Sequence, residues 1–307
     1  MSLIVPATDR PPTLPRCLHA VARARCGPDE VIVIDHPIGA GPARARNDGA
    51  QRARGDILVF LDADVEIHPD AFVRIRTAFA GSAALDAVFG AYDDRPEAPG
   101  PVSSFRNLLH HHVHCTTAGP AVTFWAGIGG VRREAFLGVG GFDADRYPRA
   151  SIEDIDLGTR LTAAGGHIVL DPEIQGTHLK AWTLRTMLAT DVRRRGAPWI
   201  ALLLRERSAA SSRALNLGWR HRASAVLSVI AAAAVPRRCS WASAGAVVGL
   251  LGLNRDFYAL LVRQRGNRVA ALGVGLHVVH HLTGIASIPS GVLLYLRERN
   301  HQPTPGS

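Results

Sequence analysis

Short apolar runs alternate with helical patterns over the first 61 residues of the chain. Residues 2–5, 31–34 and 57–61 are apolar, mostly β-branched, and bounded by turn residues, which is typical of buried parallel strands. Apolar residues at helical spacing follow Pro11-Pro12-Thr13, and residues 43–54 form an Ala/Arg pattern typical of a second helix. This order predicts an α/β fold with a doubly wound, mostly parallel sheet.

Acidic residues follow two of these three predicted strands. Asp35 comes directly after the second, and Asp62-Ala63-Asp64 after the third. A single aspartate at such a position is explained equally well by a helix cap or a turn. Ligands of doubly wound sheets bind beyond the carboxyl ends of the strands, so acids at both ends together favour a site. In extended backbone the carboxylates of Asp62 and Asp64 project to the same side, where one suits a ribose or metal-bound water and the other a divalent cation.

A second acidic cluster opens the helix predicted at residues 153–163. Asp154 and Asp156 are separated by about 200° around a helix, so at most one of them faces a common site. Leu157 marks the buried side, which leaves Glu153 and Asp154 at the helix entrance for a pocket and for general-base work. The alternative is a cluster that serves only to cap the helix.

Several motifs in the chain occur in the order typical of one enzyme family. They are V-P-A-T-D-R-P-P-T-L, V-I-V-I-D, G-P-A-R-A-R-N-D-G-A, A-R-G-D-I-L-V-F-L-D-A-D, R-R-E-A-F, V-G-G-F-D and E-D-I-D-L-G. With these motifs the chain resembles the inverting family 2 glycosyltransferases over roughly residues 2–200. The resemblance implies a nucleotide-binding fold of the A type, a nucleoside-diphosphate-sugar donor, and Mg²⁺ or Mn²⁺ as cofactor.

The resemblance also implies roles for individual residues. The implied donor-binding residues are Pro6, Thr8, Asp35, Asn47 and Asp62. The implied metal ligands are Asp64, Asp62 and His178, with a structural role as the alternative for the histidine. The implied catalytic pair is Asp154 with Glu153, and the implied wall facing donor sugar and acceptor contains Trp125, Gly127 and Arg132.

The chain departs from the family pattern at two places. His36 stands where members commonly carry a second acid after Asp35, and residues 191–199 only loosely resemble the Q-x-x-R-W motif of processive synthases. Synthesis of long polymers is therefore not expected, and arginines 193–195 either contact a diphosphate or form a solvated basic face. The histidine-rich run His110–His114 has no acid or cysteine at ligand spacing, which favours a partly exposed helix over a metal site.

The net positive charge of the chain lies in its last third. Residues 1–205 contain 23 basic and 23 acidic residues, whereas residues 206–307 contain 12 basic and three acidic ones. Because the basic region is apolar and lacks interleaved aromatic residues, it favours an anionic membrane surface over nucleic acid. Residues 223–235 and 241–253 are apolar but too short to cross a bilayer, while residues 269–296 are long enough. The alternative is a small helical soluble subdomain.

Two features place the catalytic part in the cytosol. The four cysteines form no C-x-x-C pair, which suits a reducing compartment, and the N-terminal apolar run is too short for a secretory signal. We therefore expect a glycosyltransferase domain at 1–205 and a helical membrane-associated region at 206–307, at the cell membrane and facing the cytoplasm.

The sequence thus predicts an inverting transfer from a nucleoside-diphosphate sugar to an acceptor hydroxyl, with a lipid-linked or membrane-delivered acceptor. Two alternatives remain at this point. A nucleotidyltransferase would share the acid-metal site but would not need the E-D-x-D-L element. A non-catalytic membrane scaffold with a nucleotide-sugar fold is disfavoured by the intact acids Asp62, Asp64 and Asp154. The sequence makes no prediction of oligomeric state.

Overall fold

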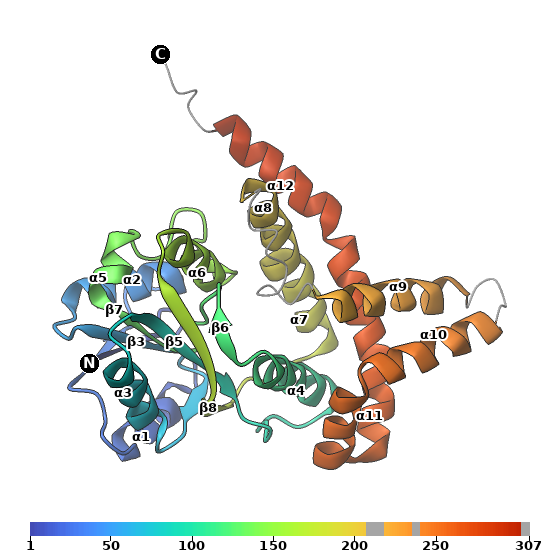
Figure 1. The fold of residues 1–307 in the computed structure, drawn as a ribbon, viewed down its shortest axis with the longest axis horizontal. Coiled ribbons are helices and arrows are strands. Elements are labelled where there is room, and N and C mark those ends of the chain that lie inside the picture. Colours follow the sequence, from blue (N-terminus) through green and yellow to red (C-terminus); the bar gives the residue numbers. More distant parts are fainter. Residues whose placement is uncertain (207–217, 235–239, 302–307) are drawn as a thin grey trace. The chain divides into compact units, whose positions relative to one another are not determined.

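The structure, a computed structural model, describes residues 1–206, 218–234 and 240–301 (Figure 1). The chain divides into two compact units. Unit 1 comprises Met1–Pro99 and Asn107–Ala181, and unit 2 comprises Gly100–Arg106 and Trp182–Ser307. The compact N-terminal unit thus ends at Ala181, whereas the expected end of the catalytic domain at residue 205 stays a prediction about function.

Unit 1 is built on a mixed sheet. Its strands are β1 (Ser2–Pro6), β2 (Glu30–Ile34), β3 (Ile57–Leu61), β4 (Val65–Ile67), β5 (Leu85–Tyr92), β6 (Gly119–Ala121), β7 (Ile128–Arg132) and β8 (His167–His178). Within the described residues they form one sheet in the order β2-β1-β3-β7-β5-β8-β4, with β6 also paired to β8. β1 runs parallel to β2 and β3, and β5 runs parallel to β8, while the other pairs are antiparallel. The α/β class and the three N-terminal strands are confirmed, but the sheet is mixed rather than mostly parallel.

Glycines explain why the antiparallel strand β7 is hard to recognise in the sequence. A Cβ at Gly130 would lie 3.0 Å from the Phe79 ring and 3.1 Å from Ile75. A Cβ at Gly129 would lie 2.5 Å from the ring of Phe124. Glycine in a strand permits such close approach but removes the β-branched pattern by which strands are recognised. β7 thereby fits between β3 and β5.

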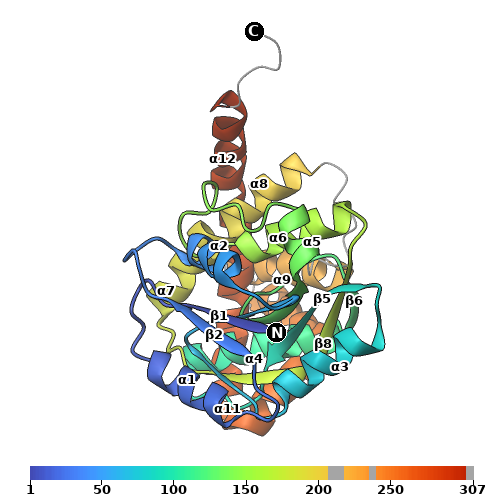
Figure 2. The ribbon, with the colours of Figure 1, turned by 90° about the vertical axis from the view of Figure 1, so that its left-hand side faces the viewer.

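Helices cover both faces of this sheet (Figure 2). They are α1 (Leu14–Arg23), α2 (Pro42–Arg52), α3 (Ala71–Gly81), α5 (Arg133–Gly138) and α6 (Glu153–Ala163), while α4 (Pro101–Thr116) continues from unit 2 into unit 1. One apolar core lies under α1 and α3 and includes Phe72, and the other lies under α2, α5 and α6 and includes Phe136. α2 has Pro42 in its first turn, and α6 has acids in its first turn that complement the helix dipole. The helices expected at 43–54 and 153–163 are confirmed.

Unit 2 is helical in its described residues. Its elements are α7 (Leu184–Ala189), the π-helical segment η1 (Thr190–Gly196), α8 (Ala197–Arg205), α9 (Trp219–Ala234), α10 (Ser240–Leu253), α11 (Arg255–Ala286) and α12 (Ile288–His301). The apolar stretches expected at 223–235 and 241–253 correspond to α9 and α10, while residue 235, Pro236-Arg237-Arg238 and the tail 302–307 lie outside the described residues. Arginines 193–195 are exposed on η1.

The stretch expected at 269–296 lies on α11 and α12, which meet at Ser287. Within the described parts of the chain, Arg255–Asn300 is the single helical segment that contains a stretch long and apolar enough to cross a membrane. The backbone kinks at Gly266, where φ is 80°. The histidines of α11 pack inside unit 2, with His277 Nδ1 at 2.9 Å from Tyr258 Oη and His280 Nδ1 at 3.0 Å from Asp191 Oδ2.

Candidate active site

The acidic pair after β3 begins the candidate site. The backbone N–H of Asp62 donates to Gly127 O at 3.1 Å, and the Val65 N–H donates back to Asp62 O at 3.0 Å, which forms a tight turn into β4. β4 pairs with β8 so that Val65 faces His178. Because Asp64 directly precedes Val65, this register brings its carboxylate to the end of β8. His178 Nε2 lies 3.5 Å from Asp64 Oδ2.

His178 is held from two sides. Its Nδ1 lies 2.6 Å from Asn107 Oδ1, and its ring stacks on Tyr92 at 4.2 Å between centroids and 9° between planes. Since an amide oxygen only accepts, Nδ1 carries a proton toward Asn107, and Nε2 is directed to Asp64, to which it donates when the ring is an imidazolium. Although burial alone would raise it, the hydrogen bond and charge of His178 hold the pKa of Asp64 below its usual value. The predicted metal ligands Asp64 and His178 therefore lie together.

A buried arginine ties the two acidic clusters to each other. Arg46 donates from Nη2 to Asp62 Oδ1 at 2.7 Å and from Nη1 to Glu153 Oε1 at 2.9 Å. The second oxygen of Glu153 accepts from the Ser151 N–H at 2.8 Å. One oxygen of this buried glutamate thus ties α6 to α2, and the other bonds the segment just before α6, which suits a structural role better than proton transfer.

Asp154 has a different environment from Glu153. Its Oδ2 accepts from the Ala126 N–H at 3.2 Å and its Oδ1 from the Ile155 N–H at 2.8 Å. No ion pair of Asp154 occurs among the described residues. Burial, reinforced by the charge of Glu153, raises the pKa of Asp154 to about 7. A carboxyl group with that pKa is suited to accept a proton near neutral pH.

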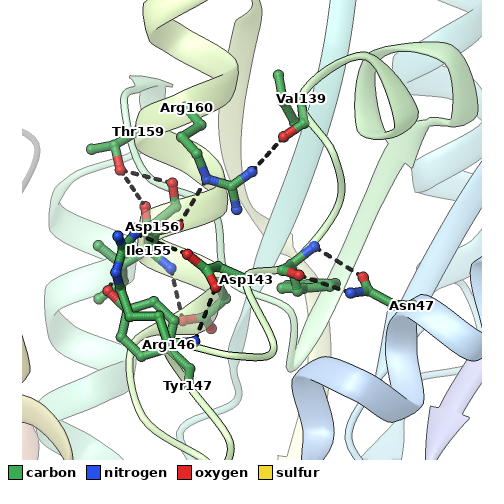
Figure 3. Close-up of polar contacts among 11 residues, drawn as sticks. Asn47, Val139, Asp143, Arg146, Tyr147, Ile155, Asp156, Thr159 and Arg160 are labelled. Atoms are coloured by element: carbon green, nitrogen blue, oxygen red, sulfur yellow. Dashed lines mark hydrogen bonds and ion pairs between the residues drawn. The ribbon is translucent and has the colours of Figure 1, made fainter. Parts of the chain in front are cut away.

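Asp156 and Asn47 serve the scaffold around these acids (Figure 3). Asp156 Oδ2 accepts from Arg160 Nε at 2.8 Å, on the helix side away from Asp154, as the helical spacing predicts. Asn47 Nδ2 donates to Phe142 O at 2.7 Å, and its Oδ1 accepts from the Phe142 N–H at 2.9 Å. The Asn47 amide therefore fixes the loop after α5, and its expected contact with the donor stays a prediction.

The segment Trp125-Ala126-Gly127 lies between the two acidic groups. Ala126 bonds Asp154 and Gly127 bonds the backbone of Asp62. The indole of Trp125 lies over Gly127, where a Cβ would come within 2.2 Å of Cζ2. The ring also packs edge-on against Tyr92 at 4.8 Å. These contacts place the predicted wall residues Trp125 and Gly127 beside the acids.

Arg132 is a correction to the predicted wall. In the register of β3 and β7, Arg132 faces Ile57 while Ile128 faces Leu61. Four residues of strand, roughly 13 Å, therefore separate Arg132 from the strand end that leads to Asp62. Its guanidinium donates to the backbone oxygens of Leu85 and Ser82, at the start of β5.

The predicted donor residues after β1 and β2 lie on neighbouring strand ends. Pro6 ends β1, and the buried Thr8 accepts through its backbone oxygen from the Gly39 N–H at 3.0 Å. Asp35 is exposed and lies 3.0 Å from His36 Nδ1, a hydrogen bond that lowers the pKa of Asp35. His36 thus partners Asp35 at the position where family members commonly have a second acid.

The histidine run of α4 tethers the helix to the sheet. His111 Nδ1 donates to Tyr92 O at 2.7 Å, and His114 Nδ1 donates to Gly90 O at 2.9 Å. The helix is partly exposed, as expected.

The donor set fits a divalent cation completed by a substrate. Among the described residues, no three His, Cys, Asp or Glu side chains converge as a metal site. Asp64 and His178 still offer one oxygen and one nitrogen ligand, while Asp62 is bonded to Arg46 and is near enough to Asp64 that burial, together with the charge of Asp64, raises its pKa. Because Mg²⁺ is usually bound by one or two carboxylates together with water and substrate phosphates, this arrangement suits a cation that binds with a diphosphate.

Arg46 and Asn107 are site residues that the sequence did not single out. Arg46 lies on the face of α2 that carries Ala43 and Ala50, at spacings of three and four. An arginine in such a buried stripe signals a buried ion pair. Asn107 has no comparable signal, since its partner His178 is 71 residues away in the chain.

The chain is similar in sequence to known glycosyltransferases. The family model described as Glycosyl transferase family 2 matches residues 27–137. Validoxylamine A glucosyltransferase of Streptomyces hygroscopicus subsp. limoneus is 27% identical over 236 residues, which cover 57% of this chain and 51% of that protein. The chain thus spans about half the length of this curated relative.

A solved structure extends the similarity to the fold. The mannosyltransferase PcManGT from Pyrobaculum calidifontis, in complex with GDP-Man and Mn²⁺, superposes with a TM-score of 0.56. Its sequence is 16% identical, and the match covers 97% of this chain and 87% of that one. Residues 27–137 are therefore similar to glycosyl transferase family 2, and the fold of the chain is similar to that of an A-type glycosyltransferase.

Proposed function

We propose that this protein transfers a sugar from a nucleoside-diphosphate sugar to an acceptor hydroxyl, in one displacement step with inversion at the anomeric carbon. The observation that carries the proposal is the short path between two acidic groups. Ala126 bonds Asp154, and the next residue, Gly127, bonds the backbone of Asp62. A base with a pKa of about 7 therefore lies beside the carboxylates suited to a cation and a diphosphate.

The nucleotide part of the donor is assigned to the strand ends. Pro6, Thr8 and Asp35 follow β1 and β2, where ligands of such sheets bind. Asp62 is assigned to the ribose, and Asp64 with His178 to the cation. When bound, Mg²⁺ or Mn²⁺ supplies positive charge that stabilises the leaving diphosphate.

A residue of the chain accepts the proton that the acceptor hydroxyl loses during transfer. The acceptor oxygen forms a bond to the anomeric carbon while the bond from that carbon to the diphosphate oxygen breaks, and the bonding electrons leave with the diphosphate. Asp154 accepts the hydroxyl proton. Its two backbone hydrogen bonds use only part of the acceptor capacity of a carboxylate, so room remains for the acceptor hydroxyl.

Arg46 and Glu153 are positioning residues in this scheme. The guanidinium offsets the negative charge of Asp62 and Glu153 and keeps both α6 and the turn after β3 in place. Glu153, the second carboxylate of the predicted catalytic pair, supports Asp154 by raising its pKa.

The relatives suggest the class of donor and acceptor. One is named a glucosyltransferase and the other was solved with GDP-Man and Mn²⁺, which supports a hexose donor and Mn²⁺ for this chain. Trp125 supplies an aromatic surface beside the acids for a sugar or acceptor ring. The apolar segment Arg255–Asn300 supports attachment to the cell membrane, and we assign a lipid-linked or membrane-delivered acceptor and a catalytic domain facing the cytoplasm.

The test is incubation of the purified full chain with UDP-, GDP- and dTDP-hexoses, Mn²⁺ and a panel of hydroxyl acceptors. We expect nucleoside diphosphate release with one donor, and a product of inverted anomeric configuration by NMR. Release of pyrophosphate from a nucleoside triphosphate and a sugar phosphate would instead identify a nucleotidyltransferase.

A further inference from the structure

The helix α9 is arranged inside out for a helix in water. Its buried face carries Ser224 and Ser228, whereas Val226 and Ile230 are 59% and 42% exposed. A surface helix of a soluble domain turns its apolar stripe inward and its polar residues outward. The opposite arrangement in α9 indicates that the surroundings of its exposed apolar face are apolar.

The buried face of α9 packs by small residues and hydrogen bonds. Ser228 Oγ donates to Ser224 O at 2.8 Å, and Asn254 Nδ2 donates to Ser224 Oγ at 2.9 Å. Ser243 Oγ donates to Ala231 O at 3.2 Å. Close packing of small residues with hydroxyl and amide bonds between helices is the mode used by helices in lipid.

α10 returns antiparallel to α9 (Figure 1). Its exposed residues include the apolar Val248 and Leu251. Later residues of α10 contact earlier residues of α9, since Ser243 bonds Ala231 while Gly249 lies against Leu227. Trp241 is 80% exposed. Together α9 and α10 form a hairpin with apolar residues outward on both helices.

Length and charge decide how such a hairpin can meet a membrane. The uncharged part of α9, residues 223–234, extends about 18 Å and α10 about 21 Å, less than the roughly 30 Å of a hydrocarbon core. Arg220 and Arg222 stand at the start of α9, and Arg237 and Arg238 stand in the sequence that connects α9 to α10. Because arginine is unfavourable at the bilayer centre, arginines on both sides of the apolar part of α9 disfavour a hairpin that spans the bilayer.

The chemistry of the partner follows from the charge. Residues 207–255 contain seven arginines and no aspartate or glutamate. Arginine at the rim complements anionic headgroups, and the exposed Trp219 and Trp241 suit the membrane–water interface. We propose that the α9–α10 hairpin lies in the plane of an anionic phospholipid membrane, with its apolar face in one leaflet. This deepens the proposed membrane attachment, and it is tested without measuring sugar transfer.

The test measures the depth of spin labels on the full chain. Val226→Cys and Val248→Cys, at residues that are 59% and 67% exposed, are labelled in a chain whose four native cysteines are alanine. The protein is reconstituted in vesicles of equal parts phosphatidylglycerol and phosphatidylcholine, with circular dichroism to verify its helicity. We expect both labels to be accessible to oxygen, shielded from a water-soluble nickel complex, and about 5–10 Å below the headgroups. A label at Leu137→Cys, exposed on α5, should remain in water.

A second experiment removes positive charge from α9. Replacing Arg220 and Arg222 by glutamine should lower the ratio of immersed to exposed label about fivefold per arginine on these vesicles. Labels in water, or labels at a depth near the bilayer centre, would overturn the proposal. The labels could also be shielded without lipid because two labelled chains pack against each other, which dipolar coupling between their labels would show. That result would assign the exposed apolar face to a second copy of the chain and would overturn the proposal too.

Discussion

Arg46 donates to Glu153 across 2.9 Å and thereby joins α2 to the entrance of α6, 107 residues further along the chain. The same guanidinium holds Asp62, so two carboxylates depend on one buried cation. The position of Asp154 therefore rests on an ion pair that lies next to it.

Arg46→Gln should destabilise the protein by about 3–5 kcal/mol, because it leaves the carboxylates of Asp62 and Glu153 without their cation in a buried place. Urea unfolding measures the effect. The matched control is Arg44→Gln, an exposed position on the same helix, which should change stability by less than about 0.5 kcal/mol. Equal stability of both variants would contradict the role of Arg46.

Asp154→Asn should keep donor binding and lower turnover at least about a hundredfold, the scale for loss of a general base. In the unmodified protein kcat/KM should rise as the pH increases through about 7, because burial raises the pKa of Asp154 to that value and the base must be deprotonated. Rate measurements from pH 5 to 9 test both statements. Near-normal turnover of the variant would move the role to Glu153 or Asp156.

Asn107→Leu should weaken Mn²⁺ binding about 10–100-fold in the presence of nucleoside diphosphate, because the partner that orients a metal-ligating histidine contributes on this scale. Asn107→Asp keeps an oxygen toward His178 Nδ1 and serves as the control that retains binding. Electron paramagnetic resonance of free Mn²⁺ gives the affinities. If Asn107→Leu binds as tightly as the unmodified chain, His178 does not depend on this contact.

Gly127→Ala should displace Trp125, because the added Cβ would lie 2.2 Å from the indole. We expect altered tryptophan fluorescence and a raised KM for the acceptor. Gly138→Ala on α5, where the added Cβ meets nothing within 4 Å, is the control. Unchanged kinetics in both variants would remove the Trp125 wall from the proposed site.

The full chain should sediment with membranes and resist carbonate extraction, since a buried apolar helix is not screened by salt. A chain that ends at residue 205 should lose this attachment and also stability, because Phe105 of α4 packs on Phe257 and His277 in unit 2. Fractionation followed by thermal unfolding distinguishes the two effects. Release of the full chain by carbonate would leave only a peripheral basic surface.

Local sequence patterns were sufficient to predict the N-terminal strands and the helix α6. The apolar runs predicted β1, β2 and β3, and the acid-rich start with a glycine pair after it predicted α6. β7 was not predicted, because its glycines serve close packing with Phe79 and hide the strand pattern. Arg132 was misplaced for a related reason, since only the strand register shows that it faces Ile57.

In the candidate site, too, some residues can be predicted from local sequence and others cannot. Asp62, Asp64 and Asp154 stand where strand ends and a helix start direct them, and these positions are visible in the sequence. The contacts that organise them join residues far apart, as when Asn107 meets His178. Such pairs depend on how the strands and α4 pack, which no local pattern encodes.

The most direct test of the account compares nucleoside diphosphate release by the unmodified chain and by Asp64→Ala, with the preferred donor and acceptor, in Mn²⁺ and in EDTA. We predict release that requires Mn²⁺ in the unmodified chain. The variant should be folded but should lose both the release and metal-dependent donor binding, because Asp64 is a partly exposed carboxylate at a strand end. Undiminished release in EDTA, or by Asp64→Ala with Mn²⁺, would contradict metal-assisted sugar transfer at this site.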